Sequence, residues 1–272
     1  MRIISKVSRA RPRHGEGDLD IRDFYRQVSS QYYRETFEET CTLSSVTRKV
    51  RTRRVVEMLD RHLPIKSILA DLGCGPAQFA EPLLERGHSY VGIDISAEMY
   101  REMAMRLLGS PRATFLTGSV EKIPLPDSSV DAAICIGVVE YLRENHAALA
   151  EIYRILKRPG VAIFTFPNLR YPIYLLRTGL RPVLAPVLRM IAPDLRDTVY
   201  VSGITHRNLW PHRFLREAVQ CGFTVRERCS HGYYPRLFNH RVPSLRFYLL
   251  MERWGERFLP GMGANYIVCL NK

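Results

Sequence analysis

The residues with the clearest chemical meaning lie in a short apolar run that ends in two glycines. Residues 67–75 read Ser-Ile-Leu-Ala-Asp-Leu-Gly-Cys-Gly. Gly73 and Gly75 lack side chains, so the backbone can turn sharply and a ligand can lie directly on it. A helix that follows would present unpaired backbone N–H groups at its start. The pattern therefore predicts a strand that leads into a ligand-binding loop.

Two nearby residues indicate which ligand this loop accepts. Dinucleotide-binding loops need a third glycine for the pyrophosphate, and this chain has Gln78 at that position. Asp71, two residues before Gly73, would repel a pyrophosphate but would suit a cation. A nicotinamide-dependent oxidoreductase is therefore disfavoured, and a cationic ligand is favoured.

A second acidic residue follows at the end of the next apolar run. Residues 90–96 read Tyr-Val-Gly-Ile-Asp-Ile-Ser, so Asp94 ends a strand. A carboxylate can accept hydrogen bonds from two ribose hydroxyls at once. Asp94 could instead cap the following helix, but Ser96 could fill that role equally well. We favour ribose binding.

Residues 71–77, Asp-Leu-Gly-Cys-Gly-Pro-Ala, resemble the first motif of the class I S-adenosylmethionine-dependent methyltransferases, of the small-molecule "type 11" branch. Ala77 stands where that family usually has a further glycine. The resemblance implies that S-adenosylmethionine is the cofactor. It also implies that Asp94 binds the ribose and that the adenine is bordered by Ile95 and Met99. The remaining cofactor contacts that it implies in the loop are Asp71, Gly73, Cys74 and Gly75.

Two later segments match the same family in order. Residues 118–126 resemble the part that binds the adenine amino group, with Ser119 in place of the usual acid and Val120 next to it. The Ser119 hydroxyl can still form a hydrogen bond, although a weaker one than a charged acceptor. Residues 130–142 match the fourth strand and its active-site loop, where Ile136 would line the sulfonium end.

Methyl transfer requires few side chains, because the methyl group of a sulfonium is already activated and the rate comes mainly from alignment. The catalytic candidates are Glu140, after the fourth strand, and His206, before a helix at 211–220. Glu140 could instead be a solvated acid at a helix start, and His206 could simply bond the backbone. The tyrosines of residues 20–40 could cover the cofactor as a lid or merely pack a helix.

The elements that must position these residues follow from alternating apolar runs and helical periodicity. Helices are expected between strands at 77–86, 96–108, 146–157 and 211–220. This alternation predicts a doubly wound, mostly parallel, Rossmann-like α/β sheet of seven strands with right-handed connections. The seven runs expected as strands are residues 67–72, 89–94, 112–116, 131–136, 160–166, 223–229 and 264–270.

The rest of the chain surrounds this domain. We expect a basic arm at 1–19, a helical N-terminal extension at 20–66, and a methyltransferase domain at 67–272 with insertions at 169–210 and 230–263. A helix at 46–62 would direct the side chains of Arg51, Arg53 and Arg54 into water. The insertion 230–263 would contain a helix with an apolar face, formed by Phe247, Leu250, Met251, Trp254 and Phe258.

Composition limits the partners. The formal net charge is +13, and the positive excess lies outside the central residues 67–168. This distribution suits binding of an anionic partner, or simply an arginine-rich surface that keeps the protein in solution. The six cysteines form no Cys-x-x-Cys pair, so we expect no metal, reduced thiols and a cytoplasmic location. No obligate protein partner is evident.

The acceptor is expected to contact the insertions, because loops at the carboxyl ends of the strands form such sites. Residues 171–192 are apolar with widely spaced arginines and would cover the pocket or rest on an anionic membrane surface. A bulky, partly apolar small molecule or a lipid- or glycan-linked acceptor fits best, with O-methylation favoured. The alternatives are a nucleic-acid methyltransferase and a non-catalytic S-adenosylmethionine-binding protein.

Overall fold

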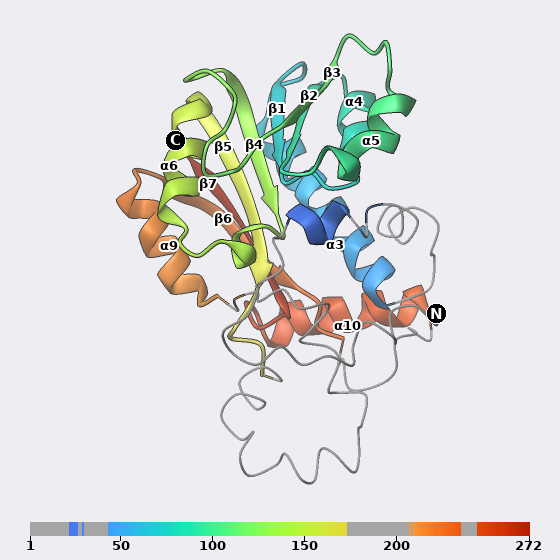
Figure 1. Ribbon diagram of the computed structural model, residues 1–272. Coiled ribbons are helices and arrows are strands. Elements are labelled where there is room, and N and C mark those ends of the chain that lie inside the picture. Colours follow the sequence, from blue (N-terminus) through green and yellow to red (C-terminus); the bar gives the residue numbers. More distant parts are fainter. Residues whose placement is uncertain (1–21, 27–28, 30–42, 173–206, 208, 235–243) are drawn as a thin grey trace, which may run out of the picture.

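The protein contains a seven-stranded sheet in the order β3-β2-β1-β4-β5-β7-β6 (Figure 1). The computed structural model describes residues 22–26, 29, 43–172, 207, 209–234 and 244–272. All pairings from β3 to β5 are parallel, and β7 lies antiparallel to both β5 and β6. The predicted doubly wound, mostly parallel, Rossmann-like sheet is confirmed. Its strands are β1 (Ile68–Leu72), β2 (Ser89–Asp94), β3 (Ala113–Thr117), β4 (Val130–Ile136), β5 (Leu156–Pro167), β6 (Thr224–His231) and β7 (Asn265–Asn271).

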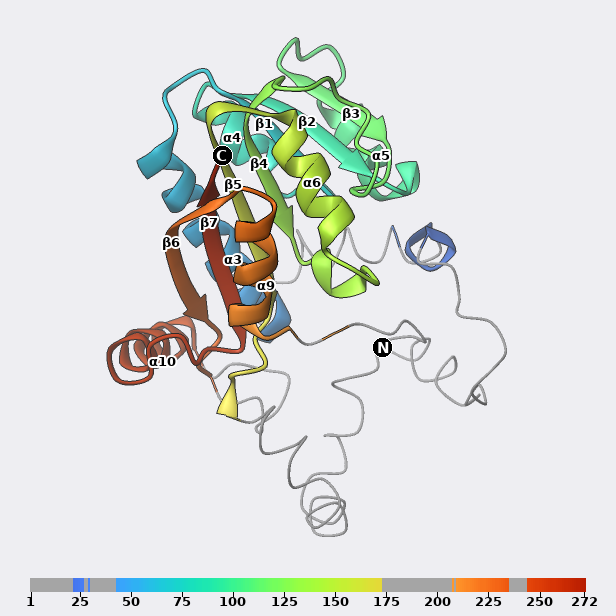
Figure 2. The ribbon, with the colours of Figure 1, turned by 90° about the vertical axis from the view of Figure 1, so that its left-hand side faces the viewer.

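Helices cover both faces of the sheet. The helices α3, α4 and α5 lie on one face, and α6 and α9 lie on the other (Figures 1 and 2). A 3-10 turn, η1, follows β4, and α10 lies between β6 and β7. The bounds are α3 (Leu43–His62), α4 (Ala80–Glu85), α5 (Ala97–Arg106), η1 (Val139–Tyr141), α6 (His146–Ile155), α9 (Pro211–Gln220) and α10 (Leu245–Phe258).

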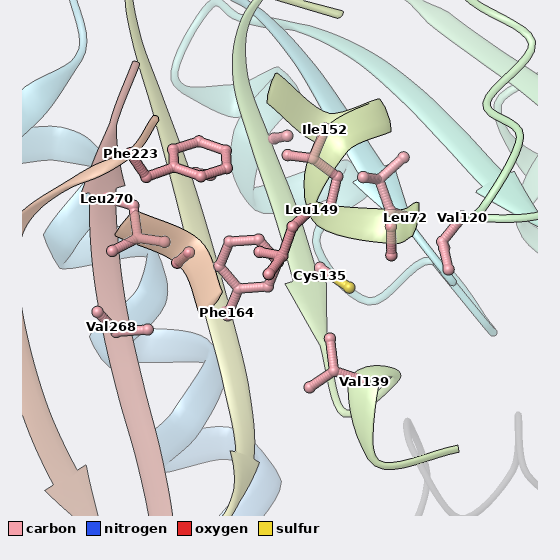
Figure 3. Packing of buried hydrophobic residues seen from close by; sticks show 14 of the residues in the cluster. Leu72, Val120, Cys135, Val139, Leu149, Ile152, Phe164, Phe223, Val268 and Leu270 are labelled. Atoms are coloured by element: carbon pink, nitrogen blue, oxygen red, sulfur yellow. The ribbon is translucent and has the colours of Figure 1, made fainter. Parts of the chain in front are cut away.

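The core on the α6 and α9 face shows why the strands are apolar on both sides (Figure 3). Leu149 and Ile152 of α6 are fully buried against Cys135 of β4 and Phe164 of β5. The neighbouring residues of β4 and β5 point the other way, into the cluster under α3 and α4. Strands buried on both faces must be apolar at nearly every position, which is why continuous apolar runs identified them.

Helix α4 begins later than its periodicity predicts. Residues 73–79 form turns that continue the glycine loop, and helical structure starts only at Ala80. Ala77 has φ +56°, a left-handed conformation that costs an L-residue about 1 kcal/mol and cannot continue a right-handed helix. Ala77 therefore has the left-handed conformation that is usual for glycine, which the resembling motif has at this position.

The predicted N-terminal arm lies wholly outside the described residues, and the N-terminal extension and both insertions lie partly outside them. The predicted domain bounds therefore stay predictions. This applies to residues 1–19 and to most of 171–192. Among the residues that are described, no helix combines the length and the apolar character needed to cross a membrane.

A buried carboxylate fixes α10 to the rest of the molecule. Glu252 is 2% exposed and accepts hydrogen bonds from the backbone N–H groups of Gly232 (2.9 Å) and Tyr233 (2.8 Å). It also pairs with Arg54 of α3 at 3.4 Å. Arg54 forms a second ion pair with the more exposed Glu256. One arginine of α3 therefore joins both acids of α10.

This arrangement predicts unequal effects for the two acids. Glu252→Ala should lower the free energy of unfolding by about 3 kcal/mol, because it leaves two buried N–H groups and part of a guanidinium without a partner. Glu256→Ala should cost less than about 1 kcal/mol, because its carboxylate is partly solvated. Urea unfolding of both variants measures the difference, and equal losses would contradict the structural role of Glu252.

Candidate active site

The glycine loop lies at the carboxyl end of β1, against the loop that follows β4. Gly73 and Gly75 have φ of +70° and +53°, which favours glycine at both positions. A Cβ atom on Gly73 would overlap Val138. The backbone N–H groups of Gly73 and Cys74 both donate to Ile93 O, at 2.7 and 3.0 Å. The missing side chain at Gly73 therefore lets two loops of the sheet edge meet.

Asp94 connects this loop to the end of β2. Its Oδ2 accepts from Gly75 N at 2.8 Å, and its Oδ1 accepts from Ser96 N at 3.0 Å. The side chain of Ser96 makes no capping bond and instead donates to Glu98 at 2.7 Å. Burial raises the pKa of the Asp94 carboxyl, and the backbone donors oppose that effect. Each carboxylate oxygen retains lone-pair capacity for a further donor, as ribose binding requires.

Asp71 supplies a second carboxyl group beneath the glycine loop. It is 2% exposed and accepts a hydrogen bond from Tyr90 Oη at 2.7 Å. Burial raises its pKa to about 7, the Tyr90 bond lowers it, Asp94 raises it and Arg51 lowers it. A cation bound nearby would favour the ionised form, because opposite charge stabilises it. Asp71 is thus suited to a sulfonium-bearing ligand.

The residues expected around the adenine lie close to this pair of acids. Gly118 N donates to Asp94 O at 2.9 Å, which brings the β3 loop to the end of β2. Ser119 Oγ accepts from Glu121 N at 3.2 Å, and Val120 is buried next to it. Met99 is also buried, whereas Ile95 is half-buried. The structure therefore brings all these sequence-predicted positions to one edge of the sheet.

These residues fit S-adenosylmethionine. A Cβ atom on Gly75 would meet only Met99 Cε, at 3.5 Å, so the backbone surface there has room for a ligand. Asp94 and Asp71 provide acceptors for hydroxyl groups and negative charge for a cation. The described residues contain no group of three or more His, Cys, Asp or Glu side chains arranged to hold a metal.

Glu140 lies in η1, beside Gly137, the glycine that follows β4. Glu140 is 8% exposed, and within the described part of the chain its Oε2 has no hydrogen-bond partner. Burial raises its pKa to about 7, while its own backbone N–H and Arg51 lower it. A solvated acid at a helix start, the alternative interpretation of Glu140, does not describe this group. A buried carboxyl with one free oxygen, in the turn that follows a parallel strand, is suited to contact a ligand.

Arg51 of α3 approaches the same point. A Cβ atom on Gly137 would lie 3.3 Å from Arg51 Nη1 and 3.5 Å from Glu140 Oε1. The expectation that Arg51 and Arg54 face water is therefore wrong, because α3 packs these side chains against the sheet edge and α10, and only Arg53 is largely exposed (77%). Helical periodicity could not predict that Arg51 lies at the site, because the acids near it, Asp71 and Glu140, are distant in sequence.

His206 lies outside the described residues. Arg207, which follows it, donates its backbone N–H to Glu140 O at 2.7 Å and its side chain to Asn145 Oδ1 at 2.9 Å. Of the proposed lid tyrosines, Tyr32 and Tyr33 are also outside, but Tyr25 is described. Its ring meets that of Tyr141 edge-on at 6.0 Å, next to Glu140. An aromatic side chain from the N-terminal extension therefore reaches the active-site loop.

A groove of about 460 Å³ separates α3 from α4 and opens beside Gln78 of the glycine loop. Four cationic side chains line it, but Arg53 pairs with Glu57 and Arg86 pairs with Asp60. The positive charge of the groove is therefore partly neutralised within the protein.

Comparisons with known proteins agree with this site. A family model described as "Methyltransferase domain" matches residues 70–164. A malonyl-[acyl-carrier protein] O-methyltransferase of Serratia marcescens is 33% identical over 97 residues, which are 36% of this chain and 37% of that protein. An uncharacterized 37.1 kDa protein in transposon TN4556 of Streptomyces fradiae is 35% identical over 164 residues, 57% of this chain and 43% of that protein.

A solved structure extends the likeness to most of the fold. Magnesium protoporphyrin IX methyltransferase from Synechocystis PCC 6803, with bound SAH, superposes with a TM-score of 0.61 at 16% identity, covering 93% of this chain and 98% of that chain. The matches to the two relatives span less than half of their lengths. Residues 70–164 are a class I S-adenosylmethionine-dependent methyltransferase domain. The predicted family and cofactor are thus confirmed for this domain.

Asp94→Ala should weaken the affinity for S-adenosylmethionine by roughly 10- to 100-fold, because hydrogen bonds to a charged group are each worth about 1.5–3 kcal/mol. Isothermal calorimetry measures this change. Asp127→Ala, which removes a largely exposed carboxylate of the same domain, is the matched control and should bind as the wild type does. Unchanged affinity in Asp94→Ala would refute the ribose role.

Proposed function

We propose that the protein transfers the methyl group of S-adenosylmethionine to an oxygen atom of a bulky, partly apolar acceptor. The acceptor would be a small molecule or a lipid- or glycan-linked one. The cofactor supplies an electrophilic methyl group, so the protein's own residues need only bind, orient and remove a proton.

The observation that carries this proposal is the position of Glu140. Its buried carboxyl lies over Gly137, and the adjacent Val138 touches the glycine loop at Gly73. Glu140 is therefore next to the place where the glycine loop would hold the cofactor. Its pKa of about 7 is close to physiological pH, which is the range in which a general base is most effective.

In this role Glu140 accepts the proton of an acceptor hydroxyl as its oxygen attacks. Arg51 lies beside the carboxyl, and its charge favours the ionised form that can accept this proton. Burial excludes water from the Glu140 side chain, which strengthens both interactions. His206 remains a second candidate for this step.

The nature of the acceptor is supported by two features. The Serratia marcescens relative is named as an O-methyltransferase of a carrier-linked acyl group, which favours oxygen as the methylated atom. The rings of Tyr25 and Tyr141 next to Glu140 offer an apolar contact surface for an acceptor that is not purely polar. Both features suit a bulky molecule better than a small, fully polar metabolite.

Labelled S-adenosylmethionine tests the function directly. The protein is incubated with a cell lysate, which is then separated into organic-soluble, aqueous, protein and nucleic-acid fractions. We expect label in the organic-soluble or aqueous fraction, in a product heavier by one CH₂ unit. Label in RNA or DNA would indicate the nucleic-acid alternative, and cofactor binding without transfer to any fraction would indicate a non-catalytic protein.

Glu140→Gln should lower kcat by about 100-fold or more, because a positioned general base contributes at least that factor. Cofactor affinity should stay within about twofold, because Gln keeps the size of the side chain. In the wild type, kcat should rise with pH through about 7, since the base is active only after Glu140 loses its proton. The variant should lose this dependence.

Glu144→Gln provides the matched control, since Glu144 is exposed in the same loop. It should retain both the wild-type rate and the pH profile. A Glu140→Gln variant that keeps the rise near pH 7 would exclude Glu140 as the base and leave His206 to be tested in the same way.

A further inference from the structure

The helix α10 exposes a continuous apolar stripe. Phe247, Leu250, Trp254 and Phe258 are 44%, 60%, 50% and 58% exposed. Their spacing of three and four residues places them along one face of the helix. Trp254 and Phe258 contact each other, with ring centroids 5.4 Å apart. Large apolar side chains gathered in one exposed stripe mark an interaction surface rather than ordinary surface scatter.

The outward direction of this stripe is fixed by the opposite face of α10. Tyr248 is fully buried and its hydroxyl lies 3.3 Å from that of Thr47 in α3. Glu252 holds the backbone after β6, as described above. A Cβ atom on Gly255 would overlap the ring of Tyr233, so only glycine permits this close packing. The helix cannot rotate the stripe inward without breaking these contacts.

Positive charge lies beside the stripe. Arg246, Arg253 and Arg257 are exposed, and helical geometry places all three along one edge of the apolar face. The two acids of α10 lie away from this edge and pair with Arg54. The exposed side of the helix therefore combines aromatic and aliphatic groups with a row of arginines. This composition is typical of helices that lie in the interface of an anionic membrane.

The helix also lies at the functionally relevant end of the sheet. Asn265, the first residue of β7, pairs with Pro167 at the carboxyl end of β5. His231, the last residue of β6, also pairs with Asn265, so the connection that contains α10 leaves and re-enters the sheet at the carboxyl ends of the parallel strands, where the glycine loop and Glu140 follow β1 and β4. A flat surface that binds α10 would face the same end of the molecule as the candidate active site.

We propose that α10 docks the protein on an anionic membrane surface. Phe247, Leu250, Trp254 and Phe258 enter the boundary between headgroups and acyl chains, and the arginine row contacts the lipid phosphates. The exposed apolar stripe with its basic edge matches a negatively charged lipid layer. This docking does not depend on methyl transfer, so it can be tested whether or not the proposed function holds.

The chain has two tryptophans, so a Trp210→Phe background leaves Trp254 as a probe within the stripe. Vesicles of phosphatidylcholine mixed with phosphatidylglycerol should shift its emission to the blue and protect it from iodide. Vesicles of phosphatidylcholine alone should do so far less. Replacing Arg246, Arg253 and Arg257 by Gln should weaken binding roughly tenfold or more, as should raised salt.

Paired variants distinguish the stripe from general hydrophobicity. Leu250→Ser with Phe258→Ser should abolish cosedimentation with the anionic vesicles. Leu108→Ser with Val219→Ser, which remove exposed apolar groups elsewhere (87% and 54% exposed), should bind as the wild type does. Replacing Arg213 and Arg216 by Gln removes exposed charge from α9, which packs on the α6 face of the sheet, and should change the binding little. Far-UV circular dichroism verifies that each variant is folded.

Two results would overturn the proposal. Absence of binding to anionic vesicles by the folded wild type would exclude a membrane as the partner. Protection of Trp254 from iodide without vesicles would show that the stripe is already covered, by another part of the same chain if the protein is monomeric, or by a second copy if the protection depends on concentration.

Discussion

The contact between the glycine loop and the β4 loop is the constraint on which the candidate site depends. Because Gly73 has no side chain, Val138 packs directly against the loop backbone. That contact places the neighbouring Gly137 and Glu140 next to the surface on which a cofactor would lie. A parallel sheet brings the carboxyl ends of β1 and β4 together, but only this missing Cβ allows their loops to touch. The close approach of the two loop backbones therefore positions the side chains of the site.

Three carboxyl groups share this edge, and burial raises the pKa of each one. Asp71 and Glu140 both reach about 7, and Asp94 shifts in the same direction. Ionising these groups is unfavourable, because burial deprives the charged carboxylate of hydration. The charge of Arg51 opposes the shift at both Asp71 and Glu140. A cationic ligand would relieve the same electrostatic cost, so the site favours positive charge before any specific contact is made.

Much of the fold could be predicted from sequence because its signals are local. Continuous apolar runs identified the seven strands, and Gly73, Gly75 and Asp94 could be recognised from residue type and spacing alone. The start of α4 was missed because the left-handed conformation of Ala77 is not encoded by helical periodicity.

The predictions that failed or stayed open depend on contacts between distant segments. Periodicity alone assigned Arg51 and Arg54 to solvent, whereas tertiary packing places Arg51 beside Gly137 and pairs Arg54 with Glu252. The apolar stripe of α10 could likewise be found from its spacing, but not its direction. That direction depends on Gly255, which admits Tyr233 against the helix. Sequence spacing predicts that a helix has an apolar face, but only tertiary packing determines whether that face contacts the core or the solvent.

The helix α3 has a mechanical consequence, because it touches both ends of this arrangement. Arg51 lies over Gly137, and Arg54, one turn later, holds the acids of α10. One helix, α3, therefore spans the distance between the loop after β4 and α10, and any tilt of this helix would move both arginines together. If binding at one end favours one tilt, thermodynamic reciprocity requires that ligands at the other end favour or oppose it equally. Through the spacing of Arg51 and Arg54, one helix thus connects the active-site loop with α10.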